Sequence, residues 1–96
     1  MIDNNTKGLI RSLIYPVQFE KDPNNGIERV VEFIIEDEAL GVGVSREKYI
    51  AAIKSALSST EELSTLIPQP HSDLKIREYL RELERTLAHS DRKRVP

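Results

Sequence analysis

The chain has 96 residues, of which 39% are hydrophobic and only five are aromatic, so it is long enough for one domain with a modest aliphatic core and too short for two. Fourteen basic residues against 16 acidic ones give a formal charge of −2, which provides no general attraction to nucleic acid or anionic lipid. The absence of cysteine excludes disulfide bonds, thiolate metal ligands and a nucleophilic cysteine.

No targeting or membrane segment is apparent in the sequence. Residues 1–8 are polar and lack the basic start and apolar centre of a signal peptide, and no run approaches the ~20 apolar residues of a membrane span. A fold without cysteine is also compatible with a reducing compartment. We therefore expect a soluble, cytoplasmic protein without a membrane partner.

The first predicted helix follows a polar run at residues 4–6, which can cap its start. Apolar residues then recur at helical spacing up to Ile14. Pro16 ends the helix, because the residue before a proline is pushed toward extended conformations. In the connector that follows, we expect Val17 and Phe19 to fold inward.

The second predicted helix begins at Asp22 and Pro23, a capping residue followed by the residue best suited to the first helical position. It ends at Gly41, where a left-handed cap conformation is easily adopted. Its expected buried stripe comprises Ile27, Val30, Val31, Ile34 and Ile35. Residues 30–35 are rich in strand-favouring types, so a buried strand remains the alternative; the flanking signals favour the helix.

The third predicted helix starts after the cap residue Ser45 and breaks at residues 58–60. A short helix over residues 59–67 should follow, because Ser59 and Glu62 have the spacing of a capping box. Prolines at positions 68 and 70 must terminate it.

The last predicted helix opens at Ser72 or Asp73 and extends to about residue 90. Its apolar stripe comprises Leu74, Ile76, Tyr79, Leu80, Leu83 and Leu87. Residues 91–96 lack such a stripe and should form a flexible basic tail. The predicted fold is all-α: residues 1–90 form a single compact antiparallel bundle of four main helices plus one short helix.

Acidic residues concentrate on the second predicted helix. Residues 27–44 carry five acidic side chains against one basic, and a four-residue spacing places three of the acids on one helical face. The candidate contact surface, which adds two acids of the short helix, comprises Glu28, Glu32, Phe33, Glu36, Asp37, Glu38, Glu61 and Glu62. Such a surface suits a basic partner, whereas the alternative is an ordinary solvated helix face.

Three aromatic residues have two interpretations each. Phe33 falls away from the predicted apolar stripe and beside charged residues, as an interface anchor would, although in a bundle this small we favour contact with a neighbouring helix. Tyr15 and Tyr79 are likewise expected to be core residues with hydroxyl groups near water.

No catalytic or cofactor motif accompanies the acidic surface. His71, Ser72 and Asp73 are the residue types of a hydrolase triad, but neighbouring side chains cannot converge as a triad requires, so turn and cap chemistry is favoured. The carboxylate at residue 36 and its neighbours lack the ligand spacing of a calcium loop. We expect neither enzymatic activity nor a metal or cofactor.

In length, lack of cysteine, acidic segment 27–40 and the terminal helix sequence REYLRELE at residues 77–84, the chain resembles the small cytosolic immunity proteins of contact-dependent growth inhibition systems. It is similar in size and acidity to the helical immunity proteins of nuclease colicins, but lacks their paired tyrosines. The resemblance implies a monomer that binds a cognate bacterial toxin domain, often a basic nuclease, in a 1:1 complex and blocks its active site.

Two alternatives remain at this level. A regulatory or adaptor protein could bind nucleic acid through residues 92–94 and the bases of the third helix, although three tail cations beside an aspartate favour a soluble terminus. A structural oligomer could instead bury an apolar helix stripe between copies.

Overall fold

The computed structural model describes the backbone of residues 2–41 and 43–93 and the side chains of residues 2–41 and 43–89. Its α-helices are α1 (Asn4–Ile14), α2 (Ile27–Leu40), α3 (Arg46–Ser58) and α4 (Asp73–Lys93). Two short 3-10 helices, η1 (Tyr15–Val17) and η2 (Pro23–Gly26), lie between α1 and α2. Because these described residues form no strand, the all-α prediction with four main helices is confirmed and the strand alternative for residues 30–35 is wrong.

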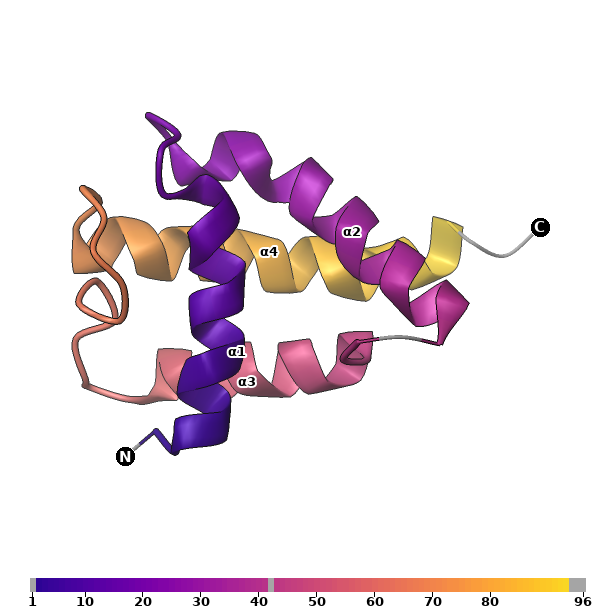
Figure 1. Cartoon of the computed structure of the whole chain (residues 1–96), viewed down its shortest axis with the longest axis horizontal. Coiled ribbons are helices and arrows are strands. Elements are labelled where there is room, and N and C mark those ends of the chain that lie inside the picture. Colours follow the sequence, from indigo (N-terminus) through magenta and orange to yellow (C-terminus); the bar gives the residue numbers. More distant parts are fainter. Residues whose placement is uncertain (1, 42, 94–96) are drawn as a thin grey trace.

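The four helices do not all share one axis direction. Figure 1 shows α3 and α4 running in opposite directions, with α2 beside α4 and α1 lying across the other helices. The principal contacts of α1 are with α3, and those of α2 are with α4. A uniformly antiparallel bundle is thus not confirmed, because α1 crosses the bundle instead of extending along it.

Most predicted helix ends coincide with local capping chemistry. The Asp22 side chain accepts a hydrogen bond from the Asn24 amide and begins η2, which continues directly into α2. Gly41 has a φ of 74° and ends α2 in the left-handed conformation that glycine adopts without steric cost. The Ser45 side chain caps α3 as predicted, whereas α1 is capped by Asp3, one residue before the polar run expected to do so.

In the described part of the chain the core is aliphatic, and the hydroxyl of Tyr79 lies deep within it. This side chain of α4 is fully buried and donates a 2.5 Å hydrogen bond to the backbone carbonyl of Leu13. Burial raises the pKa of the Tyr79 hydroxyl far above its ordinary value of 10.0. The expectation that Tyr79 belongs to the core is confirmed, but its hydroxyl lies in the interior and not near water.

The predicted short helix at residues 59–67 is wrong, because these residues form turns and bends. The Ser59 hydroxyl accepts from the Glu61 amide only two residues away, which favours a tight turn over a helix. The amide of Leu63 donates a 2.7 Å hydrogen bond to the Asp73 carboxylate. The Leu63 side chain is buried and packs in the core. Side-chain acceptors, one nearby at Ser59 and one on α4 at Asp73, therefore take amide hydrogens that a helix would use.

Four large side chains expected inside the protein lie largely in solvent. They are Tyr15 at 67% exposed, Phe19 at 92%, Phe33 at 64% and Leu74 at 68%. Tyr15, Phe19 and Leu74 lie at helix ends or in a connector, beyond the neighbouring elements that would cover them. Phe33 instead lies in the middle of α2, on a side that no other described element covers. A small domain cannot cover all its apolar side chains, and the four exposed side chains show where this one fails to do so.

Replacing Tyr79 with phenylalanine should lower the free energy of unfolding by about 1 to 3 kcal/mol, because the Leu13 carbonyl would lose its buried donor. Urea titration followed by circular dichroism measures the difference. The matched control is Tyr15→Phe at an exposed site, where a change below about 0.5 kcal/mol is expected. Equal effects of the two substitutions would contradict the structural role assigned to the Tyr79 hydroxyl.

Replacing Asp73 with alanine should destabilise the fold at pH 7 and have a smaller effect in acid. Burial raises the pKa of this carboxyl, but hydrogen bonds from the Leu63 amide and from Arg77 outweigh burial and leave the pKa below its ordinary value of 3.8. The stabilisation is therefore present above pH 3.8 and lost as the pH falls through the depressed value. Urea midpoints at pH 7 and pH 3 test this, with Glu36→Ala as the exposed control.

Candidate functional site

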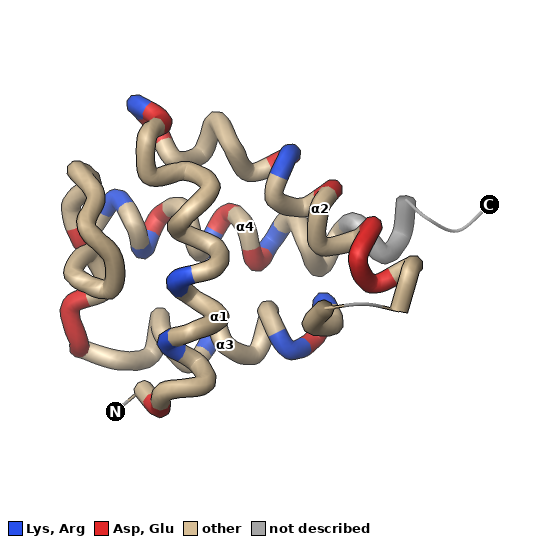
Figure 2. The backbone as a smooth tube through the Cα atoms, in the orientation of Figure 1, with Lys and Arg blue, Asp and Glu red and all other residues tan. Residues whose placement is uncertain are grey.

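The exposed face of α2 carries a row of carboxylates, Glu28, Glu32 and Glu36. All three side chains are exposed, and none forms an ion pair or hydrogen bond within the described part of the chain. Figure 2 shows the acidic positions along α2, most densely at its C-terminal end. These three residues form what we call the carboxylate ridge, and their charges are available to a partner.

The C-terminal end of α2 is an unfavourable place for negative charge. Asp37 and Glu38 occupy its last turn, which contains no basic residue. The helix dipole places partial negative charge at this end, so acidic side chains here are disfavoured by a few tenths of a kcal/mol up to about 1 kcal/mol each. Their presence calls for a compensating contact, either within the protein or with a partner.

Glu38 has such a contact within the protein. Its carboxylate pairs with the Arg46 guanidinium at 2.8 Å and also accepts a 2.9 Å hydrogen bond from the Arg46 backbone amide. The pair is largely shielded from solvent, with side-chain exposures of 27% for Glu38 and 12% for Arg46. Glu38, predicted from the sequence as a contact residue, therefore fastens the start of α3 to the end of α2.

Asp37 lies toward α3 and not on the ridge. Its Oδ2 atom is beside Gly43, where an added Cβ would be only 3.3 Å away. Burial raises the pKa of the Tyr49 hydroxyl, and the negative charge of Asp37 raises it further, which places this carboxylate near Tyr49. Asp37 is half-buried, so it is only partly available to a partner.

The other two predicted contact acids lie away from the carboxylate ridge. The segment 59–72, which contains Glu61 and Glu62, occupies the end of the molecule opposite the C-terminal end of α2 (Figure 1). Glu61 accepts a 3.2 Å hydrogen bond from the Ile2 amide, and Glu62 accepts from the Ser64 hydroxyl. The two acids therefore do not extend the densest acidic region of α2 into one continuous surface.

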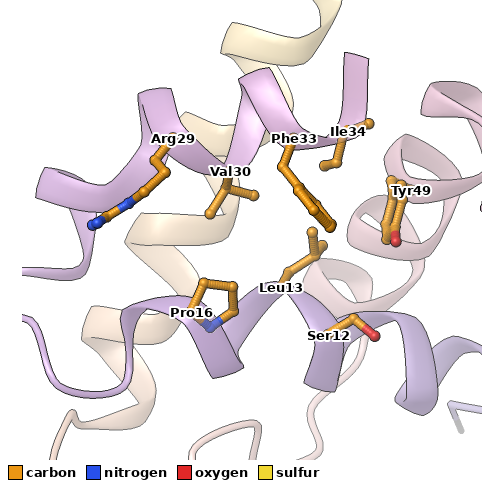
Figure 3. Close-up of a pocket in the computed structure, with 8 residues that line it drawn as sticks. All are labelled: Ser12, Leu13, Pro16, Arg29, Val30, Phe33, Ile34 and Tyr49. Carbon is orange, nitrogen blue, oxygen red and sulfur yellow. The ribbon is translucent and has the colours of Figure 1, made fainter. Parts of the chain in front are cut away.

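Phe33 is exposed and forms one wall of an apolar groove of about 400 Å³ between α1 and α2. Figure 3 shows its ring directed from α2 toward Leu13, with Tyr49 of α3 alongside. The groove is lined by Ser12, Leu13, Pro16, Arg29, Val30, Phe33, Ile34 and Tyr49. The expectation that Phe33 packs in the core is wrong, whereas its exposure is what an interface anchor requires.

Sequence reasoning missed the contribution of α1 and α3 to this groove. From the sequence, Pro16 predicts only the end of a helix, and Tyr49 lies within the third predicted helix without marking a site. Neither residue carries a local signal of a groove, because the hollow depends on how α1 crosses the bundle. The sequence did offer one signal, the position of Phe33 away from the apolar stripe of its helix.

The two histidines each contact a backbone carbonyl. The His71 Nε2 atom lies 3.3 Å from the carbonyl oxygen of Val17, and His89 Nδ1 lies 2.8 Å from that of Arg85 in the preceding turn of α4. Among the side chains of residues 2–41 and 43–89, no three acidic or histidine groups are placed together as metal ligands. In the same part of the chain, no helix combines the length and apolar character needed to cross a membrane.

Comparison of the chain with protein-family models, with curated proteins and with solved structures finds no match. The features of the chain that indicate a binding surface are the carboxylate ridge, Phe33 and the adjoining groove.

Replacing Glu38 with alanine should lower the free energy of unfolding by about 1 to 3 kcal/mol, because it removes a shielded ion pair and a helix cap together. Glu36→Ala, two residues earlier and exposed, should change it by less than about 0.5 kcal/mol. Chemical denaturation of the two variants measures both free energies of unfolding and shows whether Glu38 stabilises the fold more than Glu36 does. Similar losses for both would show that the ridge also stabilises the fold.

Proposed function

We propose that this chain is a small immunity protein that binds a basic bacterial toxin domain through the exposed face of α2. The observation that supports this most is the carboxylate ridge: three exposed acidic side chains without partners in the described chain, next to a 64% exposed aromatic ring at Phe33. Aromatic anchors surrounded by charged groups are typical of protein interfaces.

The proposed partner is a nuclease domain whose cleft is lined with lysine and arginine. Glu28, Glu32 and Glu36 would take the place of substrate phosphates, because regularly spaced carboxylates present comparable negative charge to the same cations. Blocking the cleft in a 1:1 complex would protect the producing cell, and cytoplasmic protection requires the inhibitor in that compartment. Asp37 would contribute at the edge of this contact.

The eight contact residues predicted from the sequence differ in their internal contacts and in their place on the molecule. The interface in this proposal is centred on Glu28, Glu32, Phe33 and Glu36, since Glu38 is held by Arg46. Glu61 and Glu62 belong to the segment at the other end of the molecule and are left out of it. The proposal thus predicts different consequences for acids that are chemically alike.

Neutralising Glu32 and Glu36 together, as Glu32→Gln and Glu36→Gln, should slow association with the toxin domain about tenfold or more at low salt. The effect should shrink as ionic strength rises, because salt screens exposed charges. The partner is first obtained by affinity capture of the tagged chain from a host expressing the neighbouring genes, and association is then measured by surface plasmon resonance across a salt series.

Glu62→Gln is the matched control, since it removes a charge at the far end of the molecule and should leave the association rate unchanged. Wild-type association of the double variant at every salt concentration would contradict the proposed interface. Capture of nucleic acid instead of a basic protein domain would favour the adaptor alternative, and capture of the chain alone would favour self-assembly.

A further inference from the structure

The groove between α1 and α2 is an apolar hollow that the side chains of residues 2–41 and 43–89 leave unfilled. Leu13, Val30 and Ile34, each at most 5% exposed, belong to the core and form its base, while Pro16, Phe33 and Tyr49 stand around it (Figure 3). Its volume of about 400 Å³ is within the range of pockets that hold a ligand or a partner's side chain.

The hollow continues across α1. A second depression of about 580 Å³ shares Ser12, Pro16 and Phe33 with the first and extends to Tyr15 and Ile67. Two of these five residues, Tyr15 and Phe33, are more than 60% exposed. Apolar rings that remain in water at the rim of a concave surface would release that water when a partner covers them.

Charges are distributed unevenly around the groove. Glu36 and Asp37 follow Phe33 by three and four residues, so both lie on the side of α2 that carries the ring. At the other end, the guanidinium of Arg29 is already paired with Glu20 at 2.9 Å. Arg11, which lines the second depression, donates to the Leu66 carbonyl at 3.2 Å. The side nearest Phe33 thus presents net negative charge.

We propose that the groove receives one aromatic or branched aliphatic side chain of the basic partner, with a lysine or arginine of the same segment pairing with Glu36 or Asp37. This inference rests on the proposed function and adds an apolar anchor to it. Charge complementarity selects the occupant: a cationic segment is attracted to this rim, whereas a second copy of this chain would bring its own carboxylate ridge against it.

The first test uses peptide probes and does not require the toxin. In ¹H–¹⁵N NMR spectra, acetyl-Lys-Phe-Lys-amide should shift the amide signals of Ser12, Phe33 and Tyr49, whereas acetyl-Lys-Ser-Lys-amide, with equal charge, should shift them far less. Adding Ser12→Trp, which places a large ring at the groove mouth, should abolish the difference. Equal shifts with both peptides, or shifts confined to other residues, would overturn the apolar anchor.

The second test uses the captured toxin domain. Ser12→Trp and Phe33→Ala should each weaken binding about tenfold or more. Ser55→Trp is the matched control, because Ser55 is an exposed helical serine of α3 that lines neither depression, and it should bind as the wild type does. Circular dichroism confirms that each variant remains folded.

The outcomes separate the two proposals. If neutralising Glu32 and Glu36 weakens binding while Ser12→Trp does not, the acidic interface stands and the apolar anchor is overturned. If Ser12→Trp weakens binding while charge neutralisation has no effect, the groove is an interface and the proposed acidic contact fails. Weaker binding both after charge neutralisation and after Ser12→Trp supports an interface that includes the carboxylate ridge and the groove.

Discussion

The Tyr79 hydroxyl of α4 donates a buried hydrogen bond to the Leu13 carbonyl, and this bond fixes where the C-terminal end of α1 meets α4. Leu13 lies in the last turn of α1, where carbonyl groups have no partner within their own helix. A fully buried tyrosine needs an acceptor for its hydroxyl, and a helix end needs donors for its carbonyls. The Tyr79 hydroxyl and the Leu13 carbonyl satisfy each other, and the bond attaches the C-terminal end of α1 to α4.

The apolar groove between α1 and α2 follows from the way α1 crosses the other helices. Because α1 is held across the bundle and packs mainly on α3, while α2 packs on α4, these two consecutive helices diverge instead of covering one another. Phe33 therefore has no helix above it, although an aromatic ring in so short a chain would be expected to find one. The exposure of Phe33 is a consequence of the crossing and not a packing defect of α2, whose own stripe is buried at Ile27, Val30, Val31 and Ile34.

The helices themselves were predictable because their signals are local. Capping side chains at Asp22 and Ser45, the glycine at position 41 and stripes of period 3.6 depend only on nearby residues. The absence of the short helix was not predictable, because the amide of Leu63, which follows the cap-like sequence at Ser59, donates to Asp73 ten residues further along the chain. Exposure of Tyr15 and Leu74 likewise depends on which elements pass over them, information that no window of sequence contains.

At the candidate site, the sequence also does not reveal which acidic side chains are paired within the protein. From the sequence, residues 36–38 are three equivalent acids, but in the structure each has a different environment. Glu38 is bound to Arg46, Asp37 turns toward Gly43 and Tyr49, and Glu36 remains exposed. Spacing places carboxylates on a helical face but does not identify which cation on another element reaches them.

The different environments of residues 36–38 leave Glu36 and the other acids of the carboxylate ridge as the side chains that a partner could contact. Internal contacts account for Glu38 at the α2 end, where negative charge opposes the helix dipole. They do not account for Glu32 and Glu36 on the same face, whereas Glu28 lies in the first turn of α2, where the helix dipole favours an acid. Solubility alone would be served equally by a mixture of lysine and glutamate, as on α4, where Lys75 pairs with Glu78 and Arg85 with Glu82. In the proposed function, the carboxylate ridge beside the exposed Phe33 ring would attract a cationic protein surface, because Arg29 of the same helix is already paired with Glu20.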